Sequence, residues 1–356
     1  MISGQTKPPF PSRALGTVTP ILKLICLCIL LPGAARALVI QLNPDAGLAT
    51  NPQALAAFER AAAEWETAIS SPVTIYIDAG LAAVTDPNVI GATSIKFYTN
   101  DFSDINLDFD TVRNAMAARA GRPGDTMLGY LPTSAQVSAD VPSGALFLSD
   151  TIGVLRANQR ALGLLAPLDT RADAGIVFNS NFSFDYDNSD GVAANRIDFQ
   201  TAAAHEIGHA LGFQSDVDDF DEFSAPSDNL TTLDLFRFPA SHKPTTLEQF
   251  TSYARELKPG VASVLTDTSL FYPMSTGKNL GDGRQASHWQ DDFIAQNGNI
   301  TAGPLIGIMD PTAATFAEGQ QRRRRGPGLN RVRSMFLPVF SYAFHSPPGQ
   351  PVRASF

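Results

Sequence analysis

One stretch decides how the chain folds around a site: Thr201-Ala-Ala-Ala-His-Glu-Ile-Gly-His-Ala-Leu-Gly-Phe213. It contains His205, Glu206 and His209 in the spacing H-E-x-x-H. Positions four apart lie on one face of an α-helix, so both imidazoles can reach the same metal ion. Glu206 lies beside them, where it can take a proton from a coordinated water instead of binding the metal.

The residues around this motif predict a buried helix. The motif is flanked by alanines, which are strong helix formers, with Asp198 as a candidate N-cap and Gly212 as a candidate C-cap. The alternative is that two surface histidines match the motif by chance. Unpaired histidines and a glutamate on an apolar helix would be costly without a metal, and two of the chain's five histidines fall here, so the metal site is favoured.

Residues 1–37 are predicted to be an export signal peptide. A basic start is followed by the apolar run Leu24–Leu31 and by Ala35-Arg36-Ala37, which is typical of a cleavage site. A spanning helix needs about 20 apolar residues, so a membrane anchor is disfavoured. We therefore expect a mature chain from Leu38 that is secreted or held in the cell envelope, with no stable membrane span.

Cysteine content and charge exclude several classes of site and partner. Cys26 and Cys28 both lie in the predicted signal, so the mature chain would have neither disulfides nor a thiolate metal site. The net charge of the chain is −9, but the 15 basic and 35 acidic residues of 38–318 give that segment −20. The strong negative charge of residues 38–318 argues against nucleic acid or an anionic membrane as a partner.

Hydrophobic periodicity indicates an alternation of strands and helices. We predict strands at 38–42 and 73–77 and helices at 51–70, 108–119 and 151–165. The clearest strand is Gly175–Phe184, where Ile176 and Phe178 begin an apolar alternation. This strand, just ahead of the motif helix, is our candidate for an edge strand that pairs with an extended peptide.

Two acidic clusters flank the motif helix. Asp185–Gly191 is similar to a calcium loop but lacks the EF-hand register, so a solvated turn is favoured and Ca²⁺ is a secondary expectation. The second cluster contains Asp216, Asp218, Asp219, Asp221 and Glu222. We expect most of these carboxylates to be solvated, while some orient a metal ligand or hold the loop.

The third metal ligand is less evident than the first two. A catalytic zinc site usually has three protein ligands and an open position, and the extended motif would place the third at Ser215, a poor ligand. His288, within Gln285-Ala-Ser-His-Trp289, and the acidic residues Asp216 and Asp218 are the remaining candidates. His242, in a polar loop, and His345, near the C-terminus, are assigned no role.

Together these motifs resemble the metzincin zinc peptidases, and among them the leishmanolysin type, in which a long insertion precedes the third ligand. The chain is also similar to uncharacterised secreted bacterial metallopeptidases with an H-E-I-G-H-A-L-G-F helix and a Q-A-S-H-W segment. The resemblance covers mainly residues 170–315. It implies helix ligands His205 and His209, the base Glu206, the turn at Gly212, the delayed ligand His288 and a supporting methionine turn at Met309.

The resemblance implies an α+β, metzincin-like fold with a twisted mixed sheet, an active-site helix and a C-terminal lobe after that helix. We expect a zinc metallopeptidase domain at 38–318, with lobes 38–212 and 213–318, and a basic, disordered tail at 319–356. The implied function is a secreted zinc-dependent endopeptidase that hydrolyses peptide bonds of a protein or peptide substrate through a zinc-activated water. The alternative is a secreted zinc-containing surface or binding protein without turnover; such a site needs no base like Glu206 and favours a fourth protein ligand.

Overall fold

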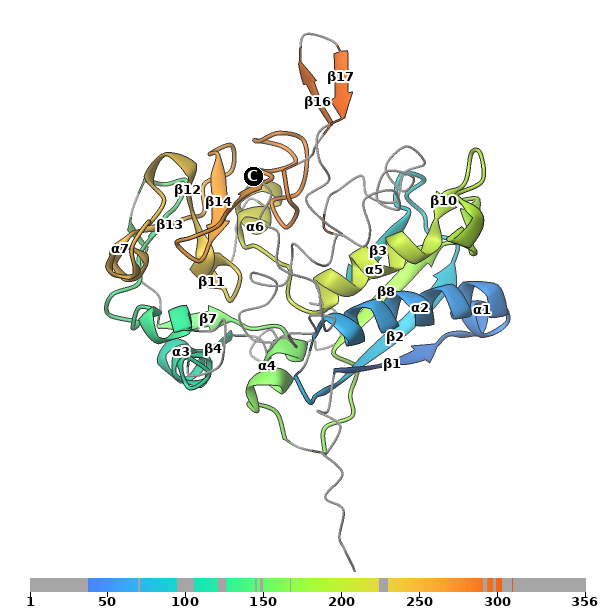
Figure 1. The fold of residues 1–356 in the computed structure, drawn as a ribbon, viewed down its shortest axis with the longest axis horizontal. Helices are drawn as coiled ribbons and strands as arrows, with labels where there is room; N and C mark the ends of the chain where they lie inside the picture. The colour runs from blue at the N-terminus through green and yellow to red at the C-terminus, as the bar shows by residue number, and fades with distance from the viewer. Residues whose placement is uncertain are drawn as a thin grey trace, which may run out of the picture. The chain divides into compact units, whose positions relative to one another are not determined.

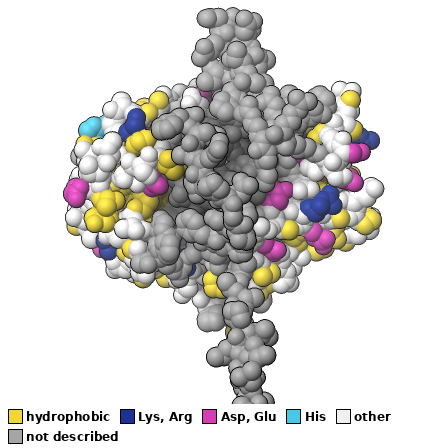
Figure 2. Space-filling view, in the orientation of Figure 1, with side chains coloured by type: hydrophobic (Ala, Val, Ile, Leu, Met, Phe, Trp, Pro, Cys, Tyr) yellow, Lys and Arg dark blue, Asp and Glu magenta, His cyan; other side chains and the backbone are white. Residues whose placement is uncertain are grey.

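A computed structural model of the chain describes residues 38–69, 71–94, 106–120, 126–144, 146–147, 150–166, 168–223, 230–290, 293–296, 299–302 and 309. The predicted signal, 1–37, and the predicted tail, 319–356 with His345, lie outside the described residues. No helix within these ranges is long and apolar enough to cross a membrane. On the face drawn in Figure 2, the described Lys and Arg side chains stand apart from one another and form no basic patch.

A twisted mixed sheet of four strands carries the site helix (Figure 1). Its order is β1 (Val39–Pro44), β2 (Thr74–Ala82), β8 (Ala174–Asn179) and β3 (Gly91–Ser94). The first three strands are parallel, and β3 runs antiparallel to β8. The expected α+β class with a mixed sheet is confirmed.

Two helices, α2 (Pro52–Ala68) and α5 (Phe199–Ala210), pack against each other and against this sheet. The buried indole of Trp65 on α2 donates to the carbonyl of Ala204 on α5 at 2.8 Å. Each helix begins at a side-chain cap: Asn51 accepts from Ala54 N and Asp198 from Thr201 N. The predicted helices and the predicted Asp198 cap are confirmed.

Strand β8 is an interior strand, so our assignment of Gly175–Phe184 as the edge strand is wrong. It is hydrogen-bonded to β2 on one side and to β3 on the other. The predicted strand is also two elements, because the chain turns at Asn179 and pairing resumes at β9 (Phe184–Asp185) with β10 (Ile197–Asp198). Among the described residues, β3 pairs with β8 alone and forms the end of the sheet.

The segment between β3 and β8 is mostly short elements. The predicted helix at 108–119 is confirmed as α3 (Phe109–Ala117), whereas the predicted helix at 151–165 is a strand followed by a shorter helix. Thr151 and Ile152 are β-branched and pair in β7 instead, which accounts for the difference. The elements here and before α2 are α1 (Ala46–Ala49), β4 (Asn106–Asp108), β5 (Ala139–Asp140), β6 (Leu146–Phe147), β7 (Thr151–Gly153) and α4 (Arg156–Leu162).

The chain after α5 forms a three-stranded antiparallel sheet in the order β12 (Arg237–Pro239), β14 (Ser263–Thr266) and β15 (Phe271–Met274). It also adds strands to sheets that contain earlier parts of the chain. Strands β11 and β13 pair in parallel with β7 and β5, respectively, so residues on both sides of Gly212 share sheets. The predicted lobe boundary at 212 stays a prediction. The elements are α6 (Val217–Glu222), β11 (Leu230–Thr231), β12 (Arg237–Pro239), α7 (Leu247–Ser252), β13 (Arg255–Glu256), β14 (Ser263–Thr266), β15 (Phe271–Met274), β16 (Phe293–Gln296) and β17 (Asn299–Ala302).

Candidate metal centre

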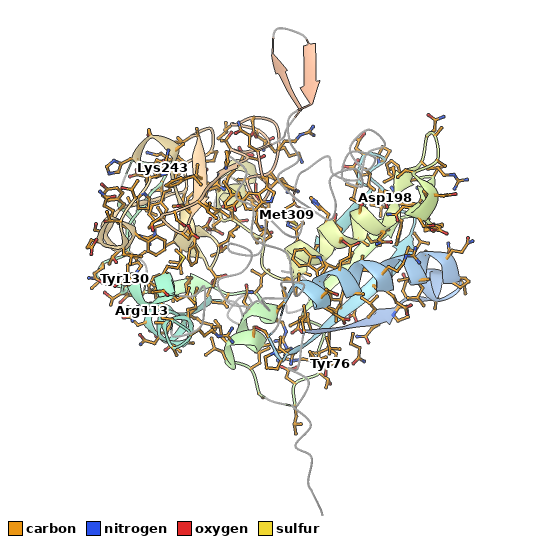
Figure 3. All side chains as sticks on the ribbon, viewed as in Figure 1. Tyr76, Arg113, Tyr130, Asp198, Lys243 and Met309 are labelled. Carbon is orange, nitrogen blue, oxygen red and sulfur yellow. The ribbon has the colours of Figure 1, made fainter. Side chains whose placement is uncertain are left out.

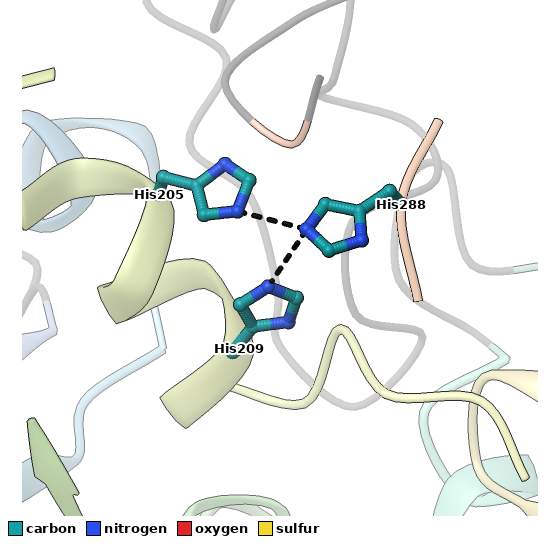
Figure 4. Close-up of side chains that lie close together, drawn as sticks. All are labelled: His205, His209 and His288. Carbon is teal, nitrogen blue, oxygen red and sulfur yellow. Dashed lines mark hydrogen bonds between the residues drawn. The ribbon is translucent and has the colours of Figure 1, made fainter. Parts of the chain in front are cut away.

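Three histidines bring their Nε2 atoms together at the end of α5 (Figure 4). His205 and His209 lie one turn apart on the helix, and His288 comes from the loop after β15. The Nε2 atom of His288 lies 3.0 Å from that of His205 and 3.3 Å from that of His209. Within the described ranges this is the one group of three or more His, Cys, Asp or Glu residues whose ligand atoms lie within 4.8 Å of one another.

The predicted third ligand, His288, therefore lies with the helix pair, whereas the alternatives Asp216 and Asp218 are outside this group. The side chain of His288 is 7% exposed, and those of His205 and His209 are partly buried.

The hydrogen bonds of two rings fix which nitrogen carries the proton. His209 Nδ1 lies 2.8 Å from the carbonyl oxygen of Phe213, and His288 Nδ1 lies 3.1 Å from that of Gln285. A carbonyl oxygen only accepts, so each Nδ1 must be the donor, and in the neutral ring Nε2 presents a lone pair. Burial lowers the pKa of His209 to about 4 and holds that of His288 well below its usual value, so both rings are neutral at pH 7.

Two lone pairs that face each other at 3.3 Å repel unless a cation lies between them. The spacing also suits zinc: with Zn–N bonds of about 2.0–2.1 Å, a tetrahedral site separates its nitrogens by roughly 3.3–3.4 Å. The separations of 3.0 and 3.3 Å are close to this value. The three histidines thus fit a zinc ion with one coordination position left for a further ligand.

Glu206 lies in the same cleft as the three histidines. Thr93 of β3 donates its hydroxyl to Glu206 Oε2 at 2.6 Å. Burial raises the pKa of Glu206 to about 7, and the Thr93 hydrogen bond opposes that rise. The cleft has a volume of about 570 Å³, and its lining includes residues of β3 and of the loop containing Arg284 and His288. A carboxyl with a pKa near neutrality can both accept and return a proton at pH 7.

Met309 packs against α5 at Gly208, the residue before His209; Figure 3 labels Met309 near this helix. A Cβ atom at Gly208 would collide with Met309 Sδ, so a larger residue there would force the Met309 side chain to shift. Met309 is fully buried, and its carbonyl accepts from Trp289 N at 3.1 Å. Met309 thus joins the helix to the residue after His288.

Gly212 ends the helix turn. Its φ of +119° is a conformation that glycine adopts readily, and a Cβ atom there would lie 2.5 Å from Asn158 Oδ1. Asn158 Nδ2 in turn donates to Leu211 O at 2.9 Å. The predicted role of Gly212 as the turn after the motif agrees with this geometry.

The acidic cluster after Gly212 holds the His288 loop, which sequence reasoning only partly anticipated. Asp218 on α6 accepts from Ala286 N at 2.5 Å, from Ser287 N at 3.0 Å and from Ser287 Oγ at 2.5 Å. Burial raises the pKa of Asp218 to about 6, and the hydrogen bonds from Ser287 and Ala286 limit that rise. The segment that carries His288 is therefore tied to a helix that begins only eight residues after His209.

Further along the same loop, Asp221 accepts from Asn279 N and Leu280 N, each at 2.8 Å. Glu222 accepts from Gln285 Nε2 at 3.1 Å. The expectation that most of this cluster is solvated is wrong: its four aspartates are buried, namely Asp216, Asp218, Asp219 and Asp221. The carboxylates of Asp218 and Asp221 accept from backbone amides 58 to 69 positions away, and no local pattern identifies such partners.

Ser215 occupies the position where the extended motif would place a third histidine, and it holds the loop instead. It is fully buried; its amide donates to Ser287 Oγ at 2.8 Å and its hydroxyl donates to Asp234 Oδ1 at 2.6 Å. Buried Arg237 adds bonds to the carbonyls of Ala286 and Ser275 at 2.9 and 2.8 Å. Sequence reasoning missed Asp234 and Arg237, because neither lies in a motif.

In the other acidic turn, Asp185–Gly191, the carboxylate of Asp185 accepts hydrogen bonds from nearby backbone amides. Asp185 accepts from Asp187 N at 3.1 Å and from Ala193 N at 2.7 Å, as a turn would. The metal-ligand group found among the described residues does not include this turn, so the calcium expectation gains no support. His242 is exposed and stacks on Tyr253, with ring centroids 4.1 Å apart.

No protein-family model, curated protein or solved structure matches this chain.

Proposed function

We propose that this protein is a zinc-dependent endopeptidase of the metzincin type with a leishmanolysin-like ligand order, and that the predicted signal directs it to the envelope or the medium. The observation that carries the proposal is the convergence of three imidazole Nε2 atoms in one cleft with Glu206. Two of the three face one another as lone-pair acceptors, which favours a bound cation.

The residues of the chain supply the remaining chemistry. Bound zinc would lower the pKa of a coordinated water and polarise the carbonyl of the scissile peptide bond. Glu206, which lies in the same cleft, would accept the proton of that water and return it to the leaving amine. The carbonyls of Phe213 and Gln285 hold the Nδ1 protons of His209 and His288, which would leave both Nε2 atoms available to hold a metal ion.

Strand β3 is the structural candidate for pairing with a substrate, in place of Gly175–Phe184. It ends the sheet in the described part of the chain, and Gly91, Ala92 and Thr93 line the cleft beside Glu206. An extended peptide added along such an edge gains main-chain hydrogen bonds that do not depend on its sequence. This arrangement favours a protein or peptide substrate.

The test is hydrolysis of casein and of quenched peptide libraries by the purified protein, with chelator and with zinc restored. We expect hydrolysis that chelation abolishes and zinc restores, and a Glu206→Gln variant that binds zinc but does not hydrolyse peptides. A zinc-loaded wild type that hydrolyses no peptide would contradict the proposal and favour the zinc-containing binding protein without turnover. Hydrolysis at equal rates by the wild type and Glu206→Gln would contradict the role of Glu206 as the base.

A further inference from the structure

The two carboxylate oxygens of Glu206 have different surroundings. Oε2 receives the hydroxyl of Thr93 at 2.6 Å. Oε1 faces Gly91, where a Cβ atom would lie 3.4 Å away. That Cβ atom would also lie 2.6 Å from the ring of Phe178, so the ring fills this position. Glu206 itself lines the cleft, and its Oε2 is the oxygen that the Thr93 hydroxyl holds.

The contact between Thr93 and Glu206 has the geometry of a strong, charge-assisted hydrogen bond. A hydroxyl that donates to a carboxylate typically lies about 2.5–2.7 Å from it, and such bonds are roughly twice as strong as neutral ones. The same hydroxyl oxygen lies 2.9 Å from the main-chain carbonyl oxygen of Glu206, so it contacts both ends of the residue. Thr93 therefore restricts rotation of the Glu206 side chain.

We propose that Thr93 is a positioning residue that fixes Glu206 so that Oε1 is the oxygen that exchanges the proton. This inference rests on the proposed function. The donated hydroxyl partly neutralises Oε2, which leaves Oε1 as the better acceptor for the water's proton. No group is consumed: the proton moves from the water to Oε1 and then to the leaving amine, and the Thr93 proton stays in place.

The position of Thr93 also joins the base to the strand proposed to bind substrate. Thr93 lies opposite Ile176 in the β3–β8 pairing, and its neighbours Gly91 and Ala92 line the cleft. One short strand thus orients the base and presents an edge to the peptide. A substrate that pairs along β3 is placed in a fixed relation to Oε1.

The first experiment compares Thr93→Val, which keeps the shape and removes the hydroxyl, with Thr93→Ser, which keeps the hydroxyl. Thr93→Val should lower kcat by ~10–100-fold, as expected for loss of a hydrogen bond to a charged group, with KM within about 2-fold and zinc content unchanged. Thr93→Ser should restore kcat to within about 3-fold of wild type. Thr67→Val, on the exposed face of α2, is the matched control and should leave kcat unchanged.

A double variant and a spectroscopic measurement separate positioning from general damage. In a Glu206→Gln background, Thr93→Val should cause no further loss, because the base is already absent. In the metal-free protein, the Thr93 hydroxyl proton should exchange slowly with water and show a nuclear Overhauser contact to Glu206. If the wild type hydrolyses no peptide, the proposed function fails, and this proton signal still decides whether Thr93 holds Glu206.

Three outcomes would overturn the inference. The first is a Thr93→Val variant with wild-type kcat. The second is a loss that appears in KM or in zinc content instead of kcat, or that Thr93→Ser does not restore. The third is a Thr93 hydroxyl proton that exchanges at the solvent rate.

Discussion

The helix half and the loop half of the metal centre are built in contrasting ways. His205 and His209 lie on α5, where a spacing of four residues alone places both rings on one face. His288 lies in a loop joined to β15 by an isolated bridge between Met274 and Trp289. The geometry of the first half follows from helical hydrogen bonds, and that of the second depends on buried side chains.

The difference shows which residues fix the position of the His288 loop relative to the helix. Ser215 and Asp218 lie in the segment just after α5, and both form hydrogen bonds with Ser287, the neighbour of His288. A buried carboxylate is costly unless its oxygens are satisfied, and the three donors around Asp218 offset that cost. The loop half should therefore be more sensitive than the helix half to changes remote from the metal.

The largest expected effect comes from removing a ligand from either half. His209→Ala and His288→Ala should each lower zinc affinity by more than ~100-fold, since loss of a partner outside the ligand shell alone costs about 10–100-fold. Zinc titration against a competing chelator measures both. Asp216→Ala should have a much smaller effect than His288→Ala; the reverse order would refute His288 as the third ligand.

A remote change in the loop half should have the next largest effect. Asp218→Ala removes the acceptor of three hydrogen bonds to Ala286 and Ser287, and we expect zinc affinity to fall by ~10–100-fold. Asp190→Asn, an exposed change in the acidic turn, is the control. Equal zinc affinity in Asp218→Ala and in the control would show that the loop holds its shape without α6.

The contact between Gly208 of α5 and Met309, whose carbonyl binds the residue after His288, can be tested by substitution. Gly208→Ala introduces a methyl group against Met309 Sδ, and we expect a loss of about 1–3 kcal/mol in the free energy of unfolding. Met309→Leu conserves volume at the same contact and should cost less than about 1.5 kcal/mol. Denaturant unfolding of the zinc-loaded variants measures both. A Gly208→Ala variant as stable as wild type would mean that α5 and Met309 are not packed this closely.

The smallest expected effect, counted per pH unit, is a pH dependence of the stability of the metal-free protein. Burial lowers the pKa of His209 to about 4 and that of His288 well below 6.5. As pH falls from 6.5 towards 4, the unfolded chain binds protons that the folded state does not, so stability decreases with falling pH. The loss should approach roughly 1 kcal/mol per pH unit for one such histidine. His288→Ala should reduce the slope, and an unchanged slope in His209→Ala/His288→Ala would assign it to other groups.

The sequence alone predicted the helix half of the metal centre, but not the loop half. The spacing of His205 and His209, the Asp198 cap and the Gly212 turn are local, so the pattern alone was enough to predict them. His288 required a resemblance to a known ligand order, because no local pattern reports contacts across 79 positions. Periodicity correctly predicted a strand at Gly175, but a period of two reports which face is buried and not which strand ends the sheet.

Strand β3 illustrates the remaining limit. Gly91-Ala-Thr-Ser94 is short and lacks an apolar alternation, so nothing in it predicts a strand. Its structure depends on antiparallel pairing with β8, 80 or more positions away. Thr93 consequently escaped notice in the sequence, although it contacts the proposed base.

The central claim is that three histidines hold one zinc ion and that Glu206 acts on the water beside it. The most direct measurement is a zinc titration of chelator-treated wild type and Glu206→Gln, followed by peptide hydrolysis at each zinc ratio. We predict that both proteins bind one zinc per chain with equal affinity, and that hydrolysis rises with occupancy up to one equivalent in the wild type only. Peptide hydrolysis that is independent of zinc, or that rises equally in Glu206→Gln, would contradict the claim.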